Sequence, residues 1–213
     1  MTPALRLLAA GGGAGLNAVI LLAPAALLGY QPLRNTVLVA AVTAVSSAVA
    51  TEIFCWLSVS APVEPAGKTD LDWLNWTQGL ALLGGFEIDI VWHMAHPHSV
   101  VAWLVCGLAL LAIGAGLRAA AILQLGVGFT NAAAPGNAAL CVDGIYRWLR
   151  HPGEVGLCLT VVGFALALQV WAVAAVTLPL FLVLSLVRVA CEERGLERRF
   201  PEDFAAYRRR VRF

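Results

Sequence analysis

The sequence has 213 residues, of which 60% are hydrophobic and 13% are charged, and its mean hydropathy is +0.81. Soluble domains contain roughly 45–50% apolar and about 25% charged residues, so the composition excludes an ordinary water-soluble fold. A bilayer core about 30 Å thick requires about 20 apolar residues per helix. We therefore expect one all-α, polytopic integral membrane domain with five or six transmembrane helices, in contact with membrane lipids and without a nucleic-acid partner.

Two apolar stretches begin the chain, residues 4–28 and 36–58, and each is long enough to span a bilayer. The short link between them contains Pro32, which predicts a tight turn and a helical hairpin. The first stretch contains Arg6 near its start, as a signal peptide would, but its apolar part is long and rich in glycine, so we interpret it as a retained span. The glycines that favour close helix packing there are Gly11, Gly12, Gly13 and Gly15.

The middle of the chain begins with a predicted exposed loop, residues 59–72, which is rich in prolines and charged residues. Residues 74–92 form a third predicted span, although Glu87 and Asp89 lie within it. The run His96-Pro97-His98-Ser99 then interrupts the apolar pattern, and residues 100–123 form a fourth predicted span.

Residues 124–152 contain glycines, asparagines and a proline that would break a membrane-crossing helix, so we predict loop or re-entrant backbone. Such backbone lies at membrane depth only where protein or a water-filled cavity satisfies its hydrogen bonds, which makes the segment a candidate site. Residues 155–190 are too long for one helix. They predict a hairpin of two spans that turns near residues 168–171, with a kink at Pro179.

The end of the chain is strongly basic, because eight of the thirteen arginines lie between Arg188 and Arg212. A short helix is predicted to start at Pro201, with Phe204, Tyr207 and Val211 on its apolar face. By the positive-inside rule the arginine-rich tail is cytoplasmic. Six spans place both termini on that side, whereas five would place the N-terminus outside.

The most informative stretch runs from Gly144 to Gly156, where polar side chains crowd against the start of an apolar helix. A purely structural interpretation explains part of it. The arginines could anchor the chain to lipid headgroups, the aromatic residues could form an interface belt, and Pro152 could occupy the first turn of the helix.

A second charged cluster, Glu192-Glu193-Arg194, follows the predicted hairpin. Because a hairpin returns the chain to its starting point, we expect Glu192 and Glu193 beside His151. The alternative is a solvated helix start in which Arg194 and Glu197 supply ion-pair partners.

In this order the motifs resemble a family of integral membrane methyltransferases that includes isoprenylcysteine carboxyl methyltransferase and the phospholipid N-methyltransferases. The family pattern is G-x-Y-x-x-x-R-H-P, a helical hairpin, E-E and a closing aromatic motif. The matching residues are Gly144, Tyr146, Arg150, His151 and Pro152, then Glu192 and Glu193, then Phe200, Phe204 and Tyr207, with an upstream part at Arg118, Leu125-Gly126 and Phe129-Thr130. The resemblance covers about residues 118–210. It divides the domain into divergent N-terminal helices, 1–117, and a methyltransferase-like part, 118–213.

The resemblance implies a cytoplasmic pocket for S-adenosyl-L-methionine, with His151 and Glu193 as its main polar contacts. This cofactor carries a carboxylate, an ammonium, hydroxyls and a sulfonium, so it needs partners of both signs. Arg147 or Arg150 could hold the carboxylate, and Glu193 could accept from the ammonium or the hydroxyls. Further implied contacts are Tyr146, Glu192, Gly144 and Pro152, with Leu140, Val142 and Ile145 over the adenine.

Methyl transfer is an in-line displacement, so alignment of the acceptor in a dry site supplies much of the rate. A carboxylate acceptor needs only an arginine to hold it, Arg150 or Arg147, whereas an amine or thiol needs a base, for which Glu154 is the candidate. The family usually has tyrosine where this chain has Glu154. A carboxylate there requires a partner, and we expect Arg150 to be that partner. The acceptor is expected to be lipophilic, and its identity stays open.

A rival site combines possible metal ligands at one membrane edge, namely Glu87, Asp89, His93, His96 and His98. It supports a metal-handling or carrier protein, although we expect no metal at the methyltransferase site. A third hypothesis is a reductase of the sterol reductase type with a nicotinamide cofactor. Glu52, in the second span, is interpreted as either a buried polar contact or a substrate-binding group.

Overall fold

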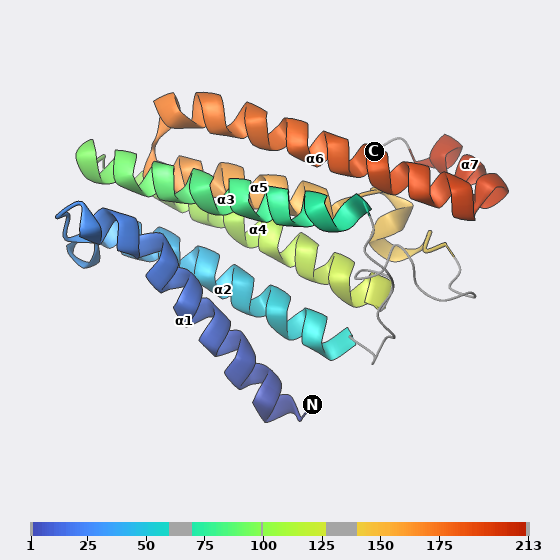
Figure 1. The fold of residues 1–213 in the computed structure, drawn as a ribbon, viewed down its shortest axis with the longest axis horizontal. Coiled ribbons are helices and arrows are strands. Elements are labelled where there is room, and N and C mark those ends of the chain that lie inside the picture. The colour runs from blue at the N-terminus through green and yellow to red at the C-terminus, as the bar shows by residue number, and fades with distance from the viewer. Residues whose placement is uncertain (1, 60–69, 99, 127–139, 212–213) are drawn as a thin grey trace.

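The computed structural model describes residues 2–59, 70–98, 100–126 and 140–211, and this part of the chain is helical throughout, apart from turns and connections (Figure 1). Its elements are α1 (Pro3–Leu27), η1 (Pro32–Arg34), α2 (Thr36–Val59), α3 (Asp70–Ala95), α4 (Val101–Leu125), η3 (Gly144–Arg147), α5 (Pro152–Leu168), α6 (Trp171–Arg199) and α7 (Pro201–Arg210).

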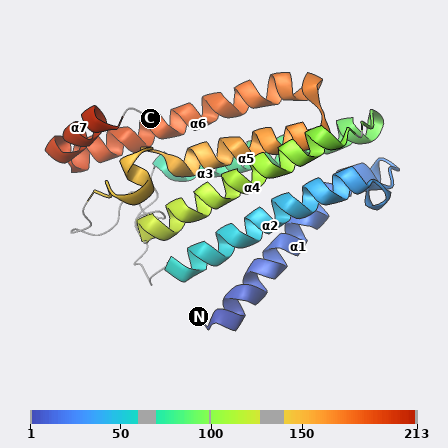
Figure 2. The same ribbon diagram turned by 180° about the vertical axis from the view of Figure 1, so that it is seen from behind.

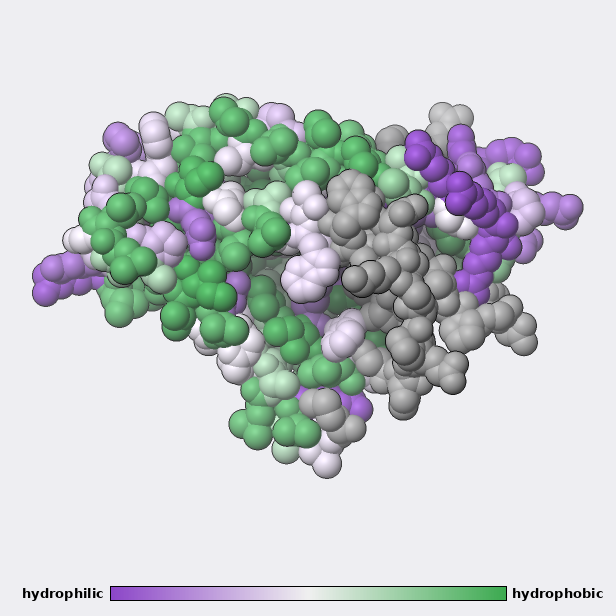
Figure 3. Space-filling model, viewed as in Figure 1, coloured by the Kyte–Doolittle hydropathy of each residue, from purple (hydrophilic) through white to green (hydrophobic). Residues whose placement is uncertain are grey.

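Helices α2 to α6 lie side by side in one elongated bundle, α1 packs against α2 near their connection and diverges from it toward the N-terminus, and α7 folds back beside the end of α6 (Figure 1). Within the described residues, four helices are long and apolar enough to cross a membrane: α1, α2, α4 and α6. Helix α5 is apolar but has only 17 residues, which corresponds to about 26 Å of helix. On the face shown in Figure 3, hydrophobic residues cover most of the bundle, and hydrophilic ones gather mainly at the end that carries α7, with a few at the opposite end. The prediction of an all-α polytopic membrane protein is confirmed.

Helices α4 and α5 form the tightest contact of the bundle and run side by side along much of their length (Figure 2). A methyl group added to Gly114 would lie 2.5 Å from the carbonyl oxygen of Gly156, and one added to Gly163 would lie 2.6 Å from that of Gly107. Only glycine permits this approach, because any Cβ would collide with the facing backbone. The predicted close packing of α1 is wrong in part, since Gly11, Gly12 and Gly15 have open space around them and only Gly13 meets another helix.

The distal end of the bundle, where α1 joins α2, α3 joins α4 and α5 joins α6, is held by neutral polar side chains. Asn35 donates to His93 Nε2 at 3.1 Å, and His93 Nδ1 lies 2.7 Å from the carbonyl oxygen of Leu168. Gln169, in the left-handed conformation at the end of α5, hydrogen bonds through its amide to both the N–H and the carbonyl of Val100. These contacts tie three connections together and account for the buried position of His93.

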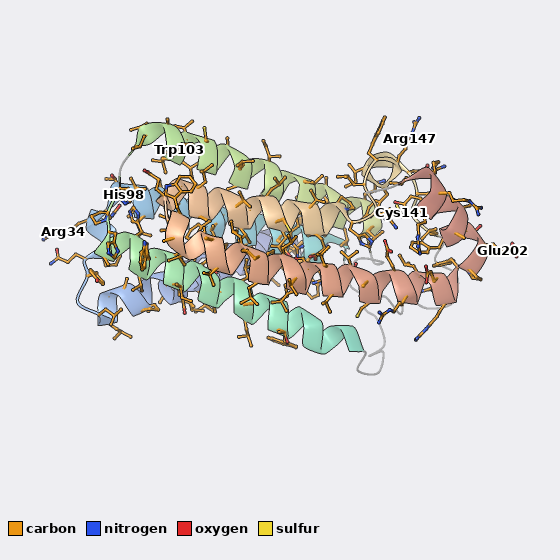
Figure 4. All side chains as sticks on the ribbon, turned by 90° about the horizontal axis from the view of Figure 1, so that it is seen from above. Arg34, His98, Trp103, Cys141, Arg147 and Glu202 are labelled. Atoms are coloured by element: carbon orange, nitrogen blue, oxygen red, sulfur yellow. The ribbon has the colours of Figure 1, made fainter. Side chains whose placement is uncertain are left out.

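The opposite, proximal end carries η3 and α7 together with the last turns of α6. Figure 4 shows the two ends, with Arg34, His98 and Trp103 at the distal end and Cys141, Arg147 and Glu202 at the proximal end. Helix α6 passes through Pro179 as one continuous helix. It ends at Arg199 and not near residue 190 as predicted, because helical backbone tolerates the charged residues once ion pairs satisfy them.

Candidate functional site

The η3–α5 junction is shaped by a proline and a glycine. Pro152 occupies the first turn of α5, where its missing N–H costs nothing, and His151 is the preceding cap residue. Gly144 starts η3 with φ of +56°, a backbone conformation that favours glycine. Gln124, at the end of α4, accepts from the N–H of Ile145 at 3.0 Å and donates to the carbonyl of Asp143. The junction therefore presents Arg150 and His151 from a fixed backbone.

The antiparallel α5–α6 hairpin brings the second charged cluster to the first, as predicted. His151 Nε2 lies 3.2 Å from Glu193 Oε1, and His151 Nδ1 lies 3.4 Å from Glu192 Oε2. Arg150 Nη1 lies 2.6 Å from the same oxygen of Glu193. All four side chains are largely buried. We call these residues, Arg150, His151, Glu192 and Glu193, the proximal charged cluster.

One helical turn further into the bundle, Arg188 extends this cluster toward the membrane. Its Nε lies 2.9 Å from Glu192 Oε1 and 3.2 Å from Glu154 Oε1. Sequence reasoning missed Arg188 as a site residue, although an arginine inside an apolar stretch is itself a functional signal. The expectation that Arg150 pairs with Glu154 is wrong. Arg150 pairs with Glu193 and Glu154 pairs with Arg188, because α6 packs beside α5 and offers each a partner of opposite charge.

Gln78 of α3 completes the deeper part of the network. Its amide oxygen accepts from Arg188 Nη1 at 2.9 Å, and its amide nitrogen donates to Glu154 Oε2 at 2.9 Å and to Ser185 Oγ at 3.0 Å. Gln78 and Glu154 are 3% and 7% exposed, so these are buried contacts. No sequence motif marks Gln78, because only the packing of α3 against α5 and α6 brings it to the site.

A separate ion pair lies beside the network. Arg118 of α4 binds Glu52 of α2 through two parallel contacts, Nε and Nη2 to the two carboxylate oxygens, both at 2.7 Å. Arg118 Nη1 also donates to the carbonyl oxygen of Gly153 at 3.3 Å. Glu52 is thus a structural partner that fixes Arg118, and Arg118 in turn fixes the start of α5.

Helix α7 covers the junction from outside. The hydroxyl of Tyr207 donates to the carbonyl oxygen of Tyr146 at 2.6 Å, and Arg210 donates to the carbonyl oxygen of Val142 at 3.2 Å. The predicted apolar face of α7 is confirmed. Phe204, Tyr207 and Val211 form a small hydrophobic cluster, against which Leu140, Val142, Leu196 and Phe200 pack. Leu140 and Val142, predicted to cover an adenine, are therefore in contact with α7.

The charges of the proximal charged cluster favour the protonated form of His151. Burial by itself lowers the pKa of this histidine, but hydrogen bonds and charges from Glu192 and Glu193 outweigh burial and raise the pKa above its ordinary value of 6.5. Burial raises the pKa of Tyr207 to about 12, so this side chain stays a neutral hydrogen-bond donor. The cluster therefore offers cationic and anionic groups side by side.

Two predicted groups do not join this cluster. Arg147 is exposed, stacks on Trp148 with 5.6 Å from its guanidinium to the ring centroid, and points away from the bundle (Figure 4). The rival group around His93 forms no arrangement of three or more metal-ligating side chains within the described residues. His93 is instead engaged by Asn35 and Leu168. Of the upstream part of the motif, Phe129 and Thr130 lie outside the described residues.

Comparison with known proteins gives two findings. Residues 94–198 match the model of the isoprenylcysteine carboxyl methyltransferase family. The chain is also 29% identical over 126 residues to a human protein named protein-S-isoprenylcysteine O-methyltransferase, an alignment that covers 52% of this chain and 40% of the human one. The chain thus spans about two fifths of the length of the curated relative it matches. The matched segment contains the junction, the α5–α6 hairpin and the proximal charged cluster. Residues 94–198 of this membrane-type helical chain are therefore similar to the isoprenylcysteine carboxyl methyltransferase family.

Proposed function

We propose that the protein transfers a methyl group from S-adenosyl-L-methionine to a lipophilic acceptor, and that this acceptor is the carboxylate of a prenylated cysteine. One observation carries the proposal. Arg150 and His151 face Glu192 and Glu193 across the α5–α6 hairpin, within the segment that matches the methyltransferase family.

The residues present suit the chemistry of the cofactor. Its carboxylate requires a cation, for which Arg150 is the buried candidate at the junction. Its ammonium and hydroxyl groups require acceptors, for which Glu192 and Glu193 supply carboxylate oxygens. His151 lies between these two carboxylates. It can keep a hydrogen bond to one of them through one ring nitrogen and donate to the cofactor through the other. When bound, the cofactor supplies an electrophilic methyl group on a sulfonium.

Charge balance supports an anionic acceptor. In the network and the neighbouring ion pair together, four carboxylates face three arginines and a histidine whose pKa is raised. The carboxylates are those of Glu52, Glu154, Glu192 and Glu193, and the arginines are Arg118, Arg150 and Arg188. S-adenosyl-L-methionine carries one net positive charge, and a carboxylate acceptor carries one negative charge. The two together leave the network balanced. A carboxylate needs no general base, so Glu154 would serve to hold Arg188 and not to accept a proton.

The chain's own residues have three tasks in this reaction. The proximal charged cluster binds and orients the cofactor. Arg188, one turn closer to the membrane, holds the acceptor's head group in line with the methyl group. Helix α7 and the apolar walls of the hairpin exclude water, which strengthens the electrostatic contacts inside and prevents hydrolysis. We further propose that the proximal end faces the cytoplasm, since exposed arginines of α6 and α7 gather there.

Calorimetric binding to the detergent-purified protein tests the cofactor first. S-adenosyl-L-methionine and its demethylated product should bind, NADPH should not, and His151→Ala should weaken binding by about 10- to 100-fold, the value of a lost hydrogen bond to a charged group. His96→Ala is the matched control, because His96 is an exposed histidine at the distal end. Binding of NADPH alone would replace the proposal with a reductase.

Transfer of a labelled methyl group tests the acceptor. We expect label to appear on a small prenylated cysteine derivative as a base-labile ester. The same derivative with its carboxylate blocked as an amide should accept no label. Label on a phospholipid amine and none on the prenylated cysteine would keep the methyltransferase and overturn the proposed acceptor.

A further inference from the structure

Gln78 lies outside the segment that matches the methyltransferase family, yet its side chain is one of the most buried polar groups at the proximal end. It is 3% exposed and touches three network residues, Arg188, Glu154 and Ser185. These contacts fix the direction of its amide. The oxygen must face the guanidinium, because the nitrogen is committed to a carboxylate and a hydroxyl.

Two largely buried arginines of this region, Arg118 and Arg188, bind their carboxylates in different ways. Arg118 forms the parallel, two-contact arrangement with Glu52, which is the strong geometry for an arginine and a carboxylate. Arg188 does not, although two carboxylates lie beside it. Its Nε is shared between Glu192 and Glu154, while Nη1 is held by Gln78. Its hydrogen bonds to described residues are made through Nε and Nη1.

Gln78 explains this difference. By holding Nη1, its amide oxygen opposes the rotation that would bring Nη2 onto Glu154 and close a two-contact pair. By donating to Glu154 Oε2, its amide nitrogen engages one carboxylate oxygen, while Oε1 lies 3.2 Å from Arg188 Nε. Both effects oppose the formation of a two-contact ion pair between the Arg188 guanidinium and Glu154.

We propose that Gln78 is a positioning residue for the acceptor half of the site: it keeps Arg188 open toward the acceptor's head group, and so makes α3 a determinant of acceptor specificity. This inference rests on the proposed function. Gln78, Glu154 and Ser185 lie outside the proximal charged cluster, whereas Glu192 links Arg188 to it. Loss of Gln78 should therefore affect use of the acceptor more than binding of the cofactor.

The test compares Gln78→Leu with the wild-type chain in two measurements. In steady-state methyl transfer to the prenylated cysteine derivative, kcat/KM for the acceptor should fall by about 10- to 100-fold, as expected for a misplaced substrate-orienting group. In calorimetry, the Kd for S-adenosyl-L-methionine should change less than about threefold, because the contact between Arg188 and Glu192 remains. Ser185→Ala, which removes one partner of the amide, should give a smaller loss of the same kind.

An exchange of the two side chains separates positioning from simple packing. Gln78→Glu places two carboxylates in contact, and Glu154→Gln removes a charge, so each should lower acceptor kcat/KM. The double variant Gln78→Glu with Glu154→Gln restores one amide and one carboxylate beside Arg188, and should recover most of the loss. Glu87→Gln is the matched control on α3, since Glu87 contacts none of these residues and its variant should keep wild-type kinetics.

Three outcomes would overturn the inference: unchanged acceptor kinetics in Gln78→Leu, a parallel loss of cofactor affinity, or failure of the exchange variant to recover. Failure of the proposed function is distinguishable from these. A wild-type chain that binds the cofactor but methylates no prenylated cysteine removes both proposals, whereas wild-type turnover that persists in Gln78→Leu removes only the role of Gln78.

Discussion

The two ends of the bundle are both held by buried polar side chains, but with different chemistry. At the distal end Asn35, His93 and Gln169 are neutral, and all three bind backbone groups. At the proximal end the groups are mostly charged, and Arg188 shares one nitrogen between Glu192 and Glu154.

This contrast separates polar groups that hold the fold from those that we propose bind ligands. When a side chain donates to a buried backbone carbonyl, breaking that hydrogen bond leaves the carbonyl oxygen without a donor, which costs free energy. Charged groups with several mutual partners can exchange one of them for a ligand. Two histidines illustrate the difference: His93 and His151 are both buried at helix ends, but only His151 lies between carboxylates.

The largest expected effect is at the proximal end. Arg188→Leu leaves the carboxylates of Glu154 and Glu192 without this cation, and loss of one partner from a buried ion pair costs about 3–5 kcal/mol. Thermal unfolding in detergent should show a strong decrease in Tm. The double variant Arg188→Leu with Glu154→Leu should lose less than the sum of the single variants, and a strictly additive result would contradict the coupling.

At the distal end, His93→Ala should destabilise the fold without changing the site. It leaves the carbonyl of Leu168 without its histidine partner and removes one partner of the Asn35 amide, at a cost of about 1–3 kcal/mol for a buried group. Chemical denaturation measures this loss, and calorimetry on the folded protein should give an unchanged Kd for S-adenosyl-L-methionine. A large loss of cofactor affinity in His93→Ala would contradict the view that the distal end contributes to stability and not to cofactor binding.

Helix α7 should respond more weakly. Tyr207→Phe removes the hydrogen bond to the carbonyl of Tyr146, which is worth about 0.5–1.5 kcal/mol. Hydrogen exchange should show faster opening of α7 and η3, with the distal end unaffected. Equal protection of α7 in both proteins would mean that the hydrophobic cluster around Phe204 alone holds it.

The smallest effect is a dependence on pH. Because the pKa of His151 is raised in the folded chain, its ion pairs contribute stability that is complete below the ordinary pKa of 6.5 and is lost as pH rises through the raised value. The Tm difference between wild type and His151→Gln should therefore shrink from acidic toward alkaline pH. Tyr207→Phe is the control, since a pKa of about 12 keeps Tyr207 neutral throughout that range. A difference that grows with pH would contradict the protonated state.

Several features were predictable because they depend on residues close together in the chain. The proline after His151, the turn after Leu168 and the capping signals at Pro201 each set local backbone, and the structure has helix boundaries at all three. Because α5 and α6 form a hairpin, the chain returns to the level of His151, and this brings the two glutamates into contact with it. The end of α6 was not predictable in this way, because ion pairs with other elements stabilise its charged turns.

The sequence by itself determined the membrane class, through its composition, and the proximal charged cluster, through two motifs separated by one hairpin. Only the tertiary structure decided which partner each charge has. Glu154 follows Arg150 by four residues in sequence but binds Gln78 and Arg188, residues that come from α3 and α6. Gln78 has no motif around it, and the glycines that matter are those of α4 and α5, not those of α1. The physical reason is that side-chain pairing depends on the relative rotation of packed helices, which no single helix encodes.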